Sequence, residues 1–157
     1  MSPDFEQLIR QHSARIRRIA RRYAAPAAVD DLVQDILVRL WRSHPSFRSD
    51  ARVETWIYRV ALNASMTHVK NSIRERAAQS ALATSSPSFE TTHGATGMAD
   101  VLEHFLAQLG DIDASVLMMY LDGLTPEEMS SVLGVSANAI SVRINRMKQK
   151  FSDTYVD

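Results

Sequence analysis

The sequence predicts an all-α protein: two small helical bundles joined by a flexible linker, the C-terminal one containing a helix-turn-helix. Apolar residues recur at helical spacing along most of the chain. The 157 residues include only five Gly and five Pro, which suits helices better than a turn-rich β fold. A polar stretch near the middle interrupts the periodic pattern, so the chain is expected to form two units.

Helical spacing predicts three helices in residues 1–76, over about 5–23, 30–43 and 52–70. Asp30 or Asp31 can cap the second helix, and Pro45 can stop it. The apolar stripes of the second and third helices consist of Leu32, Val33, Ile36, Leu37, Leu40 and Trp41, and of Val53, Trp56, Ile57, Val60, Ala61 and Ala64. Together with the first helix, these stripes could close one bundle.

Residues 77–98 are rich in Ser, Thr, Ala and Gly and contain no Lys or Arg, so we expect a flexible linker. Four short helices are expected after it, over about 99–109, 112–122, 126–133 and 137–153. Their shared core is predicted to contain Val116, Leu117, Leu121, Leu124, Leu133, Ile140 and Ile144. Residues 99–157 would thus form a second unit.

The net charge of zero averages two unlike halves. Residues 1–80 hold 14 Lys and Arg against 8 Asp and Glu, whereas residues 81–157 hold 4 against 10. This asymmetry indicates two surfaces with different roles. The chain has no cysteine, which excludes disulfides and Cys-ligated zinc, and it has no apolar run of membrane-spanning length. We therefore expect a cytoplasmic protein without membrane insertion.

The stretch TPEEMSSVLGVSANAISVRINRMKQKF has the layout of a helix-turn-helix. Thr125 can cap its first helix, Gly134 permits a tight turn, and Ser136 can cap its second helix. The inward stripe of that second helix is Ile140, Ile144, Met147 and Phe151. Its opposite face presents amides, hydroxyls, an arginine and Val142, a set suited to reading base edges in a major groove. The alternative is a solvated helix whose polar face has no ligand.

A second candidate surface lies on the helix expected after residue 52. Tyr58, Arg59, Asn63 and Lys70 should face away from its apolar stripe. Aromatic rings stack on unpaired bases and cations follow phosphates, so this set suits single-stranded nucleic acid. Trp56 fits the core of a small bundle as well as it fits a base contact.

The motifs DDLVQDILVRLWR and FRSDARVETWIYRVALN, followed by the helix-turn-helix, resemble the extracytoplasmic-function sigma factors of bacterial RNA polymerase. These are minimal sigma factors of the sigma-70 family in which a linker joins region 2 to region 4. The resemblance extends over nearly the whole chain. It implies that the protein binds core RNA polymerase and directs promoter-specific transcription initiation.

The resemblance implies three sets of binding residues. The set for the β′ clamp of the polymerase is Asp31, Gln34, Asp35, Arg39 and Trp41. The set for the unpaired minus-ten strand is Phe47, Arg48, Ser49, Asp50, Trp56, Arg59 and Asn63. Tyr58 and Lys70 join this set because an aromatic ring can stack on a base and a cation can contact a phosphate. The set for the minus-thirty-five duplex is Ser136, Asn138, Ser141, Val142, Arg143, Asn145 and Arg146. Region 4 is also expected to touch the polymerase β flap.

The sequence departs from the family pattern at several positions. Val53 stands where an aromatic residue is usual, Glu54 where a basic or aromatic residue is usual, and Leu62 where Arg is frequent. In the second helix of the helix-turn-helix, the common Thr-Val-Lys-Ser-Arg is replaced by residues 139–143, AISVR. The melting surface is therefore less basic than average, and the promoter preference is expected to differ.

Two other functions account for part of the sequence. A helix-turn-helix repressor explains residues 99–157, predicts a dimer on duplex operators and leaves the first half unexplained. A sigma mimic that sequesters an anti-sigma protein explains both halves but not the acid-free basic run near the C-terminus. An enzyme is not expected, because the five His residues lack metal-ligand spacing and no Gly-rich phosphate loop occurs. We expect no cofactor or metal, a monomer when free, and an anti-sigma factor as an additional candidate partner.

Overall fold

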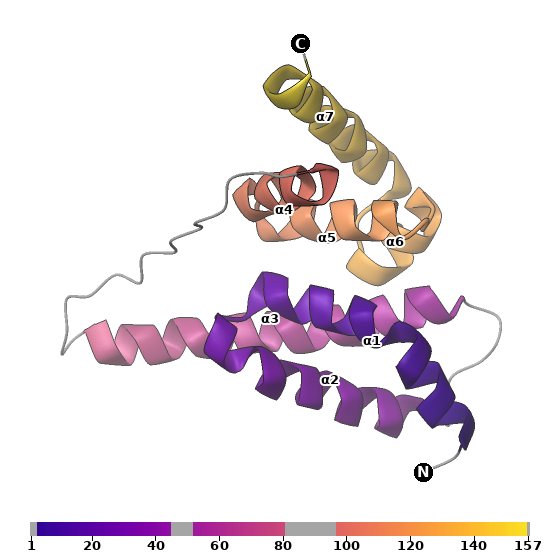
Figure 1. The fold of residues 1–157 in the computed structure, drawn as a ribbon, viewed down its shortest axis with the longest axis vertical. Helices are drawn as coiled ribbons and strands as arrows, with labels where there is room; N and C mark the ends of the chain where they lie inside the picture. Colours follow the sequence, from indigo (N-terminus) through magenta and orange to yellow (C-terminus); the bar gives the residue numbers. More distant parts are fainter. Residues whose placement is uncertain (1–2, 45–51, 81–96, 157) are drawn as a thin grey trace.

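The computed structural model describes residues 3–44, 52–80 and 97–156, and all regular secondary structure there is helical. The all-α prediction is therefore confirmed. The first bundle contains α1 (Pro3–Tyr23), α2 (Val29–Ser43) and α3 (Val53–Ser80), with the short 3-10 turn η1 (Pro26–Ala28) before α2. The second contains α4 (Met98–Gln108), α5 (Asp111–Leu121), α6 (Pro126–Leu133) and α7 (Ala137–Tyr155). Figure 1 shows the two groups of helices one above the other.

The first bundle buries the apolar stripes that helical spacing predicts. Its fully enclosed side chains include Ile16, Ile19, Leu32, Ile36, Leu40 and Ile57. Two expectations are wrong. Trp41 is 50% exposed rather than part of the core. The N-cap of α2 is Ala28, which makes no side-chain cap hydrogen bond, because η1 already leads the backbone into the helix.

The helix α3 runs to Ser80, well beyond the point near residue 70 where the sequence predicts that it fades. Its last turns are mostly exposed and project past the other helices of the bundle (Figure 1). The segment RERAAQ at residues 74–79 consists of strong helix formers. Intrinsic propensity, rather than burial of an apolar face, therefore carries this extension.

The second bundle is organised around Phe105, Val116, Met119, Met129, Ile140 and Ile144. The expected caps of the helix-turn-helix are confirmed. Thr125 and Glu128 form a capping box at the start of α6, Gly134 ends α6 at φ 73°, and the Ser136 side chain accepts a hydrogen bond from the backbone N–H of Ala139. Leu121 is exposed, so its predicted place in the core is wrong.

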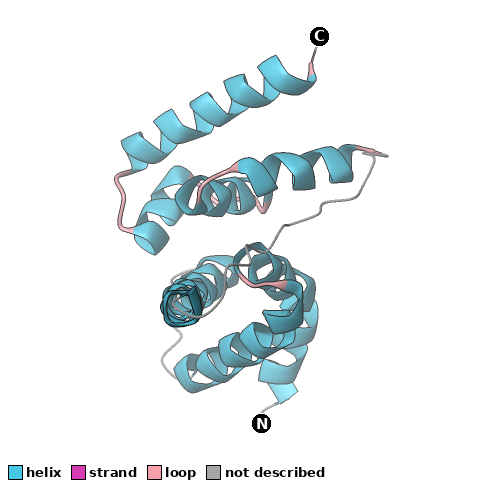
Figure 2. Cartoon of the chain, turned by 90° about the vertical axis from the view of Figure 1, so that its left-hand side faces the viewer, coloured by secondary structure: helices cyan, strands magenta, loops and turns pink. Residues whose placement is uncertain are grey.

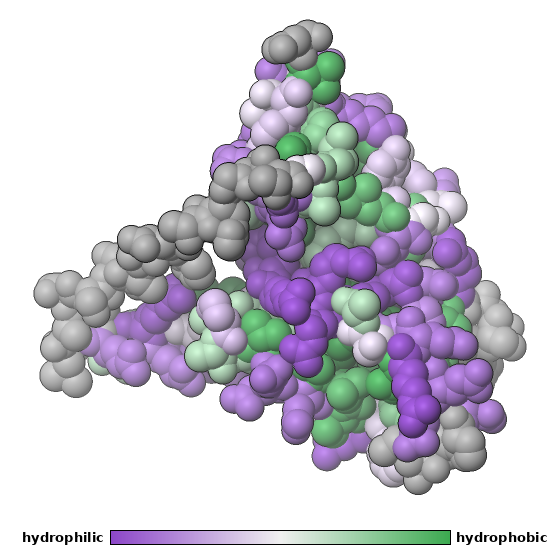
Figure 3. All heavy atoms as spheres, in the orientation of Figure 1, coloured by the Kyte–Doolittle hydropathy of each residue, from purple (hydrophilic) through white to green (hydrophobic). Residues whose placement is uncertain are grey.

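The two bundles pack against each other, and the relative arrangement was not evident from the sequence. The α5–α6 side of the second bundle lies over α1 and α3, as two nearly perpendicular views show (Figures 1 and 2). Hydrophilic residues run across the middle of the molecule, where the bundles meet (Figure 3). The contact between the bundles includes ion pairs and hydrogen bonds, such as those of Arg15 with Asp122 and of Thr55 with Glu128.

Candidate nucleic-acid interface

The outer face of α7 is the first candidate surface. Asn138, Asn145 and Arg146 are exposed on it, and Val142 is 40% exposed among them. Ser141 is half-buried, and Ser136 is exposed at the N-cap. The buried stripe of Ile140, Ile144 and Met147 fixes the opposite side of the helix against the second bundle. The face is thus held rigidly with its polar groups and one aliphatic side chain turned outward.

Arg143 differs from the other residues of this set. Its guanidinium Nη1 lies 2.7 Å from Oδ1 of Asp113, so the side chain is half-buried and ties α7 to the first turn of α5. Asp113 was not among the residues that sequence reasoning selected. Arg143 thus helps to hold α7, the second helix of the helix-turn-helix, against α5. Its ion pair with Asp113 would have to break before the guanidinium could contact DNA fully.

The α3 helix carries the second candidate surface. Arg59, Asn63 and Lys70 are exposed. Trp56 is only 6% exposed and packs against the His44 ring, with 6.1 Å between the ring centroids. Of the two positions that the sequence allowed for Trp56, the structure shows the one in the bundle core. The remaining members of the minus-ten set, Phe47, Arg48, Ser49 and Asp50, lie outside the described residues.

Tyr58 and Thr55 are covered by the second bundle. Tyr58 is 0% exposed and donates a hydrogen bond of 2.5 Å to Oδ2 of Asp122. Thr55 donates to Glu128 at 3.0 Å, and Arg59 donates to the Ser131 hydroxyl at 3.2 Å. The outward exposure expected for Tyr58 is wrong in this arrangement, because α5 and α6 lie against this part of α3.

Asp122 is the electrostatic centre of this contact. Arg15 Nε lies 2.8 Å from Oδ2 of Asp122, and Arg18 Nη1 lies 3.3 Å from Oδ1. Burial alone would raise the pKa of Asp122, but the hydrogen bonds from Tyr58 and Arg15 and the charges of both arginines hold that pKa below its ordinary value. Burial, together with the nearby carboxylate, raises the pKa of Tyr58. The phenol therefore stays protonated and the carboxylate stays charged.

The outer face of α2 is a third candidate surface. Asp31 and Gln34 are exposed, and Asp35 is linked to Arg39 by an i,i+4 ion pair of 3.1 Å. Trp41 and Val38 are exposed on the same side of the helix. Sequence reasoning missed Val38, although its position three and four residues after Asp35 and Gln34 places it at the centre of this face. The face thus combines acids, an amide and apolar area.

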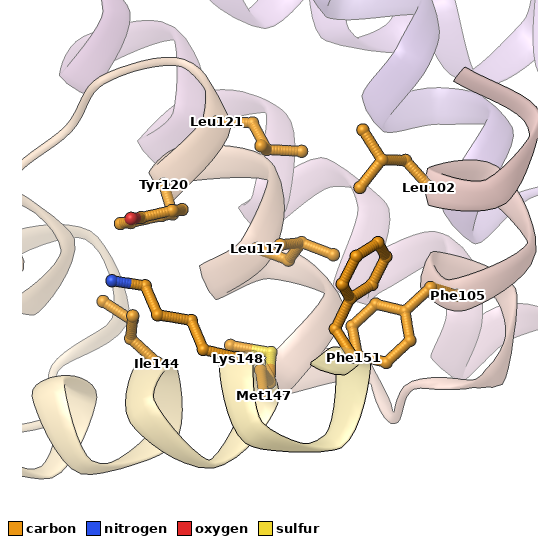
Figure 4. Close-up of a pocket in the computed structure, with 9 residues that line it drawn as sticks. All are labelled: Leu102, Phe105, Leu117, Tyr120, Leu121, Ile144, Met147, Lys148 and Phe151. Atoms are coloured by element: carbon orange, nitrogen blue, oxygen red, sulfur yellow. The ribbon is translucent and has the colours of Figure 1, made fainter. Parts of the chain in front are cut away.

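An apolar hollow lies in each bundle. In the second bundle, Leu117, Leu121, Phe105 and Phe151 surround a cavity of about 190 Å³, with Lys148 at its edge (Figure 4). Lys148 Nζ lies 5.0 Å from the centroid of the Tyr120 ring. In the first bundle, a more open hollow of about 440 Å³ lies between α1 and α2 and is bordered by Val38 and Trp41, with Phe5, Glu6, Ile9, Arg10 and Leu37.

No group of three or more His, Cys, Asp or Glu residues in the described ranges is arranged to hold a metal ion. Among the helices that the structure describes, none has the length and hydropathy of a membrane span.

Known families match both parts of the chain. Residues 8–75 match Sigma-70 region 2, and residues 99–151 match Sigma-70, region 4. The ECF RNA polymerase sigma-E factor of Escherichia coli (strain K12) is 23% identical, over 92% of this chain and 83% of the relative. The ECF RNA polymerase sigma factor SigE of Mycolicibacterium smegmatis is 27% identical, over 96% of this chain and 61% of the relative.

Solved structures share the fold. The sigma factor RpoE of Bartonella quintana, in complex with the anti-sigma factor NepR, superimposes with a TM-score of 0.78 at 18% identity, covering 97% of this chain and 96% of that one. CnrH, in complex with the cytosolic domain of CnrY, gives a TM-score of 0.64 at 24% identity, covering 95% and 85%.

The fold and the two matched regions define a transcription initiation factor rather than an enzyme. The chain belongs to the sigma-70 family of RNA polymerase sigma factors, in the extracytoplasmic-function group. It binds RNA polymerase and promoter elements through regions 2 and 4. The repressor alternative explained only the second half, whereas the region 2 match covers most of the first.

Proposed function

We propose that three surfaces divide the work of initiation: two lie on the region 2 bundle, in residues 1–76, and one lies on the region 4 bundle, in residues 99–157. The proposed linker over 77–98 begins as the last turn of α3, which runs to Ser80, and ends at the first residue of α4. The outer face of α2 binds the β′ clamp through Asp31, Gln34, Asp35, Arg39 and Trp41. Support comes from the exposure of Asp31 and Gln34 and from the apolar area of Trp41 and Val38 beside them. Charge and apolar surface on one helix suit a specific protein contact.

The α3 face captures the unpaired minus-ten strand. Arg59 and Lys70 would contact phosphates, Asn63 a base edge, and Tyr58 would stack on a base once the second bundle has moved away. Trp56, Phe47, Arg48, Ser49 and Asp50 complete the proposed set. Opening about ten base-pair steps at roughly 1.4 kcal/mol each costs on the order of 14 kcal/mol. Stacking returns only about 1–3 kcal/mol per base, so contacts with polymerase must supply the difference.

The outer face of α7 reads the minus-thirty-five duplex. Asn138, Asn145 and Arg146 can donate and accept hydrogen bonds at base edges, while Val142 can contact a thymine methyl group. Ser141 and Ser136 lie beside them, and Arg143 would join the contact after release from Asp113. The rigid support of this helix by Ile140, Ile144 and Met147 favours a defined docking geometry.

Two further contacts complete the assignment. The β flap of the polymerase would engage region 4, where the groove around Leu117 and Phe151 offers apolar surface. RpoE of Bartonella quintana binds the anti-sigma factor NepR, and the likeness of fold supports proposing an anti-sigma partner for this chain as well. The free protein is proposed to be a cytoplasmic monomer.

The observation that carries this proposal is that the two polar reading faces, on α3 and α7, belong to different bundles matched to different sigma regions. Run-off transcription with sigma-free core polymerase on genomic fragments tests it, with reactions lacking the protein as the control. Transcripts that start at defined sites only when the protein is present support the assignment. Duplex binding without polymerase, and no transcript, would favour a repressor.

A further inference from the structure

The last turns of α3 carry exposed cations that the fold of the first bundle does not use. The tail of α3, residues 71–79, projects past the other helices of that bundle (Figure 1). Within the described part of the chain, the Arg74 side chain has no hydrogen bond or ion pair. We propose that this tail binds the phosphates of the duplex immediately upstream of the minus-ten element, with Arg74 as the contact. This inference rests on the proposed role of the α3 face and adds a binding residue to it.

Arg74 lies on the side of α3 that we propose to face the unpaired strand. This side, the α3 row, consists of Arg59, Asn63, Lys70 and Arg74, all of them exposed. Each residue of an α-helix turns by about 100°, so these four side chains lie within a sector of about 60° around the helix axis. The two acids of α3, Glu54 and Glu75, lie outside that sector. The row is therefore a continuous surface without negative charge.

Burial does not explain why the helix extends so far. The only large apolar side chain of the tail, Ile73, is 60% exposed. Because each helical residue rises by about 1.5 Å, Arg74 lies about 16 Å beyond Asn63 along the axis. One base pair rises by about 3.4 Å, so this separation corresponds to about five base pairs. The extension thus lengthens the surface of α3 that a nucleic acid can follow.

The chemistry of the α3 row changes along the helix. Past Asn63 its members are Lys70 and Arg74, and this part contains no aromatic ring on which an unpaired base could stack. Such cations contact phosphates, and an Arg guanidinium can do so through two hydrogen bonds. The first part of the row therefore suits an unpaired strand, whereas the tail suits the sugar-phosphate backbone alone.

The order of the two regions along the chain gives the direction of the contact. Residues after Ser80 lead to region 4, whose proposed target, the minus-thirty-five duplex, lies upstream of the minus-ten element. We therefore place the end of α3 on the upstream side, where the two strands are still paired. The phosphates about five base pairs from the Asn63 contact then belong to duplex DNA.

A phosphate contact has a recognisable signature. It adds affinity to every promoter sequence alike, because phosphates carry no sequence information. Each such contact also releases counterions, so its loss reduces the slope of log affinity against log salt by about 0.9. A residue that only stabilises the helix would not change this slope.

The test uses the full-length chain bound to core polymerase and fork templates from a promoter identified by run-off transcription. Each template carries the unpaired minus-ten strand, and its upstream duplex is either about two or about ten base pairs long, because about five are needed to reach Arg74. Arg74→Ala should weaken binding to the long template by about tenfold at 50 mM salt and by about threefold at 200 mM. Binding to the short template should not change.

The matched control is Arg76→Ala. It removes the same charge from the same exposed tail, but residue 76 lies about 160° around the helix from residue 74. Both templates should bind this variant as they bind the unmutated chain. Equal losses with Arg74→Ala and Arg76→Ala would show a general attraction of charge rather than a docked row, and no loss with either would leave the tail a solvated helix. Each of these results overturns the proposal.

A rescue variant tests the geometry directly. In the Arg74→Ala chain, one alanine inserted before position 74 turns Arg76 by about 100° and brings it onto the α3 row. Binding to the long template should then recover, and circular dichroism should show unchanged helix content. An unchanged helix without recovery would contradict the assignment of this side of the tail.

The variant Arg59→Ala/Asn63→Ala separates this inference from the proposed function. It should weaken binding to both templates, since both carry the unpaired strand. If it weakens neither, the proposed role of the α3 face fails. If it weakens both while Arg74→Ala weakens neither, the α3 face keeps its role and the tail contact alone is overturned.

Discussion

Tyr58, on the α3 face that we propose reads the unpaired strand, donates its phenolic hydrogen to the carboxylate of Asp122 in region 4 across 2.5 Å. The two residues are 64 positions apart in the sequence. An aromatic side chain proposed to stack on an unpaired base is thus occupied by the other half of the same protein. Several properties of the free chain follow from this relationship.

Acidification should weaken the contact between the bundles. While the two bundles are in contact, the pKa of Asp122 lies below its ordinary value of 3.8. The charged Asp122 therefore stabilises the contact fully above pH 3.8, and this stabilisation is lost as the pH falls through the lower pKa. The side chains that contact Asp122 are Arg15, Arg18 and Tyr58. Asp122→Asn should therefore change the separation of the two bundles, measured as the distance between labels on α3 and α7, less below pH 3.8 than at neutral pH. A constant difference would contradict this assignment.

Charge reversal on α2 should abolish binding to core polymerase. Asp31→Lys and Asp35→Lys place positive charge on the proposed clamp surface, where like-charge contacts cost several kcal/mol. Binding can be measured with labelled sigma and core polymerase, and circular dichroism should show an unchanged helix content. Glu75→Lys, at an exposed site on α3, is the control and should bind normally. Retained binding by Asp31→Lys/Asp35→Lys would remove the clamp assignment.

The capping box of α6 should be measurable as stability. Thr125 accepts from the backbone N–H of Glu128, whose carboxylate accepts from the backbone N–H of Thr125. Thr125→Ala should lower the free energy of unfolding by about 1 kcal/mol. Thr154→Ala, an exposed residue in the last turn of α7, should change it by less than about 0.5 kcal/mol. Urea titrations of the two variants check the difference.

The turn of the helix-turn-helix depends on Gly134. Its φ of 73° lies in the left-handed region, which costs a residue with a Cβ about 1–2 kcal/mol. Gly134→Ala should therefore destabilise region 4 by that amount, although a Cβ there would meet no atom within 4 Å. Gly110→Ala is the comparison, since its φ of −67° suits any residue; it loses only the preference for Gly over Ala at the N-cap of α5, so its cost should stay below about 1 kcal/mol. Equal effects would show that backbone strain is not the cause.

Asn145 should contribute specificity and Lys150 only affinity. An amide on the outer face of α7 can contact a base edge, so Asn145→Ala should cost about 1–3 kcal/mol and relax the preference at one base pair. Lys150, one turn further on, should contact phosphate at most, so Lys150→Ala should weaken all promoters alike. Transcription from a library of minus-thirty-five variants separates these effects. A uniform loss with Asn145→Ala would argue against base reading by this residue.

Local signals made most of the fold predictable. The caps at Thr125 and Ser136 and the turn at Gly134 are encoded within a few residues, and the structure confirms them. The extension of α3 to Ser80 was missed because the prediction followed the apolar stripe and gave little weight to helix-forming residues on a fully exposed segment. Trp41 was misplaced because helical spacing does not show which edge of a stripe has a neighbouring helix to cover it.

The contact between the bundles was not predictable from motifs, because it joins residues far apart in the sequence. Spacing correctly placed Tyr58 on the side of α3 away from its own core, but it could not show that Asp122 covers that side. One global signal was available. The excess of cations in the first half and of acids in the second is the charge complementarity that Arg15, Arg22 and Arg52 use in their ion pairs.

The reading of the minus-ten strand by α3 is tested most directly by permanganate reactivity of unpaired thymines at a promoter identified by run-off transcription. Polymerase with the unmutated sigma should give reactive thymines in the minus-ten element. Arg59→Ala/Asn63→Ala should bind core polymerase equally well and give at least about tenfold less reactivity, because each lost base or phosphate contact costs about 1–3 kcal/mol. Undiminished reactivity with that variant would contradict the account.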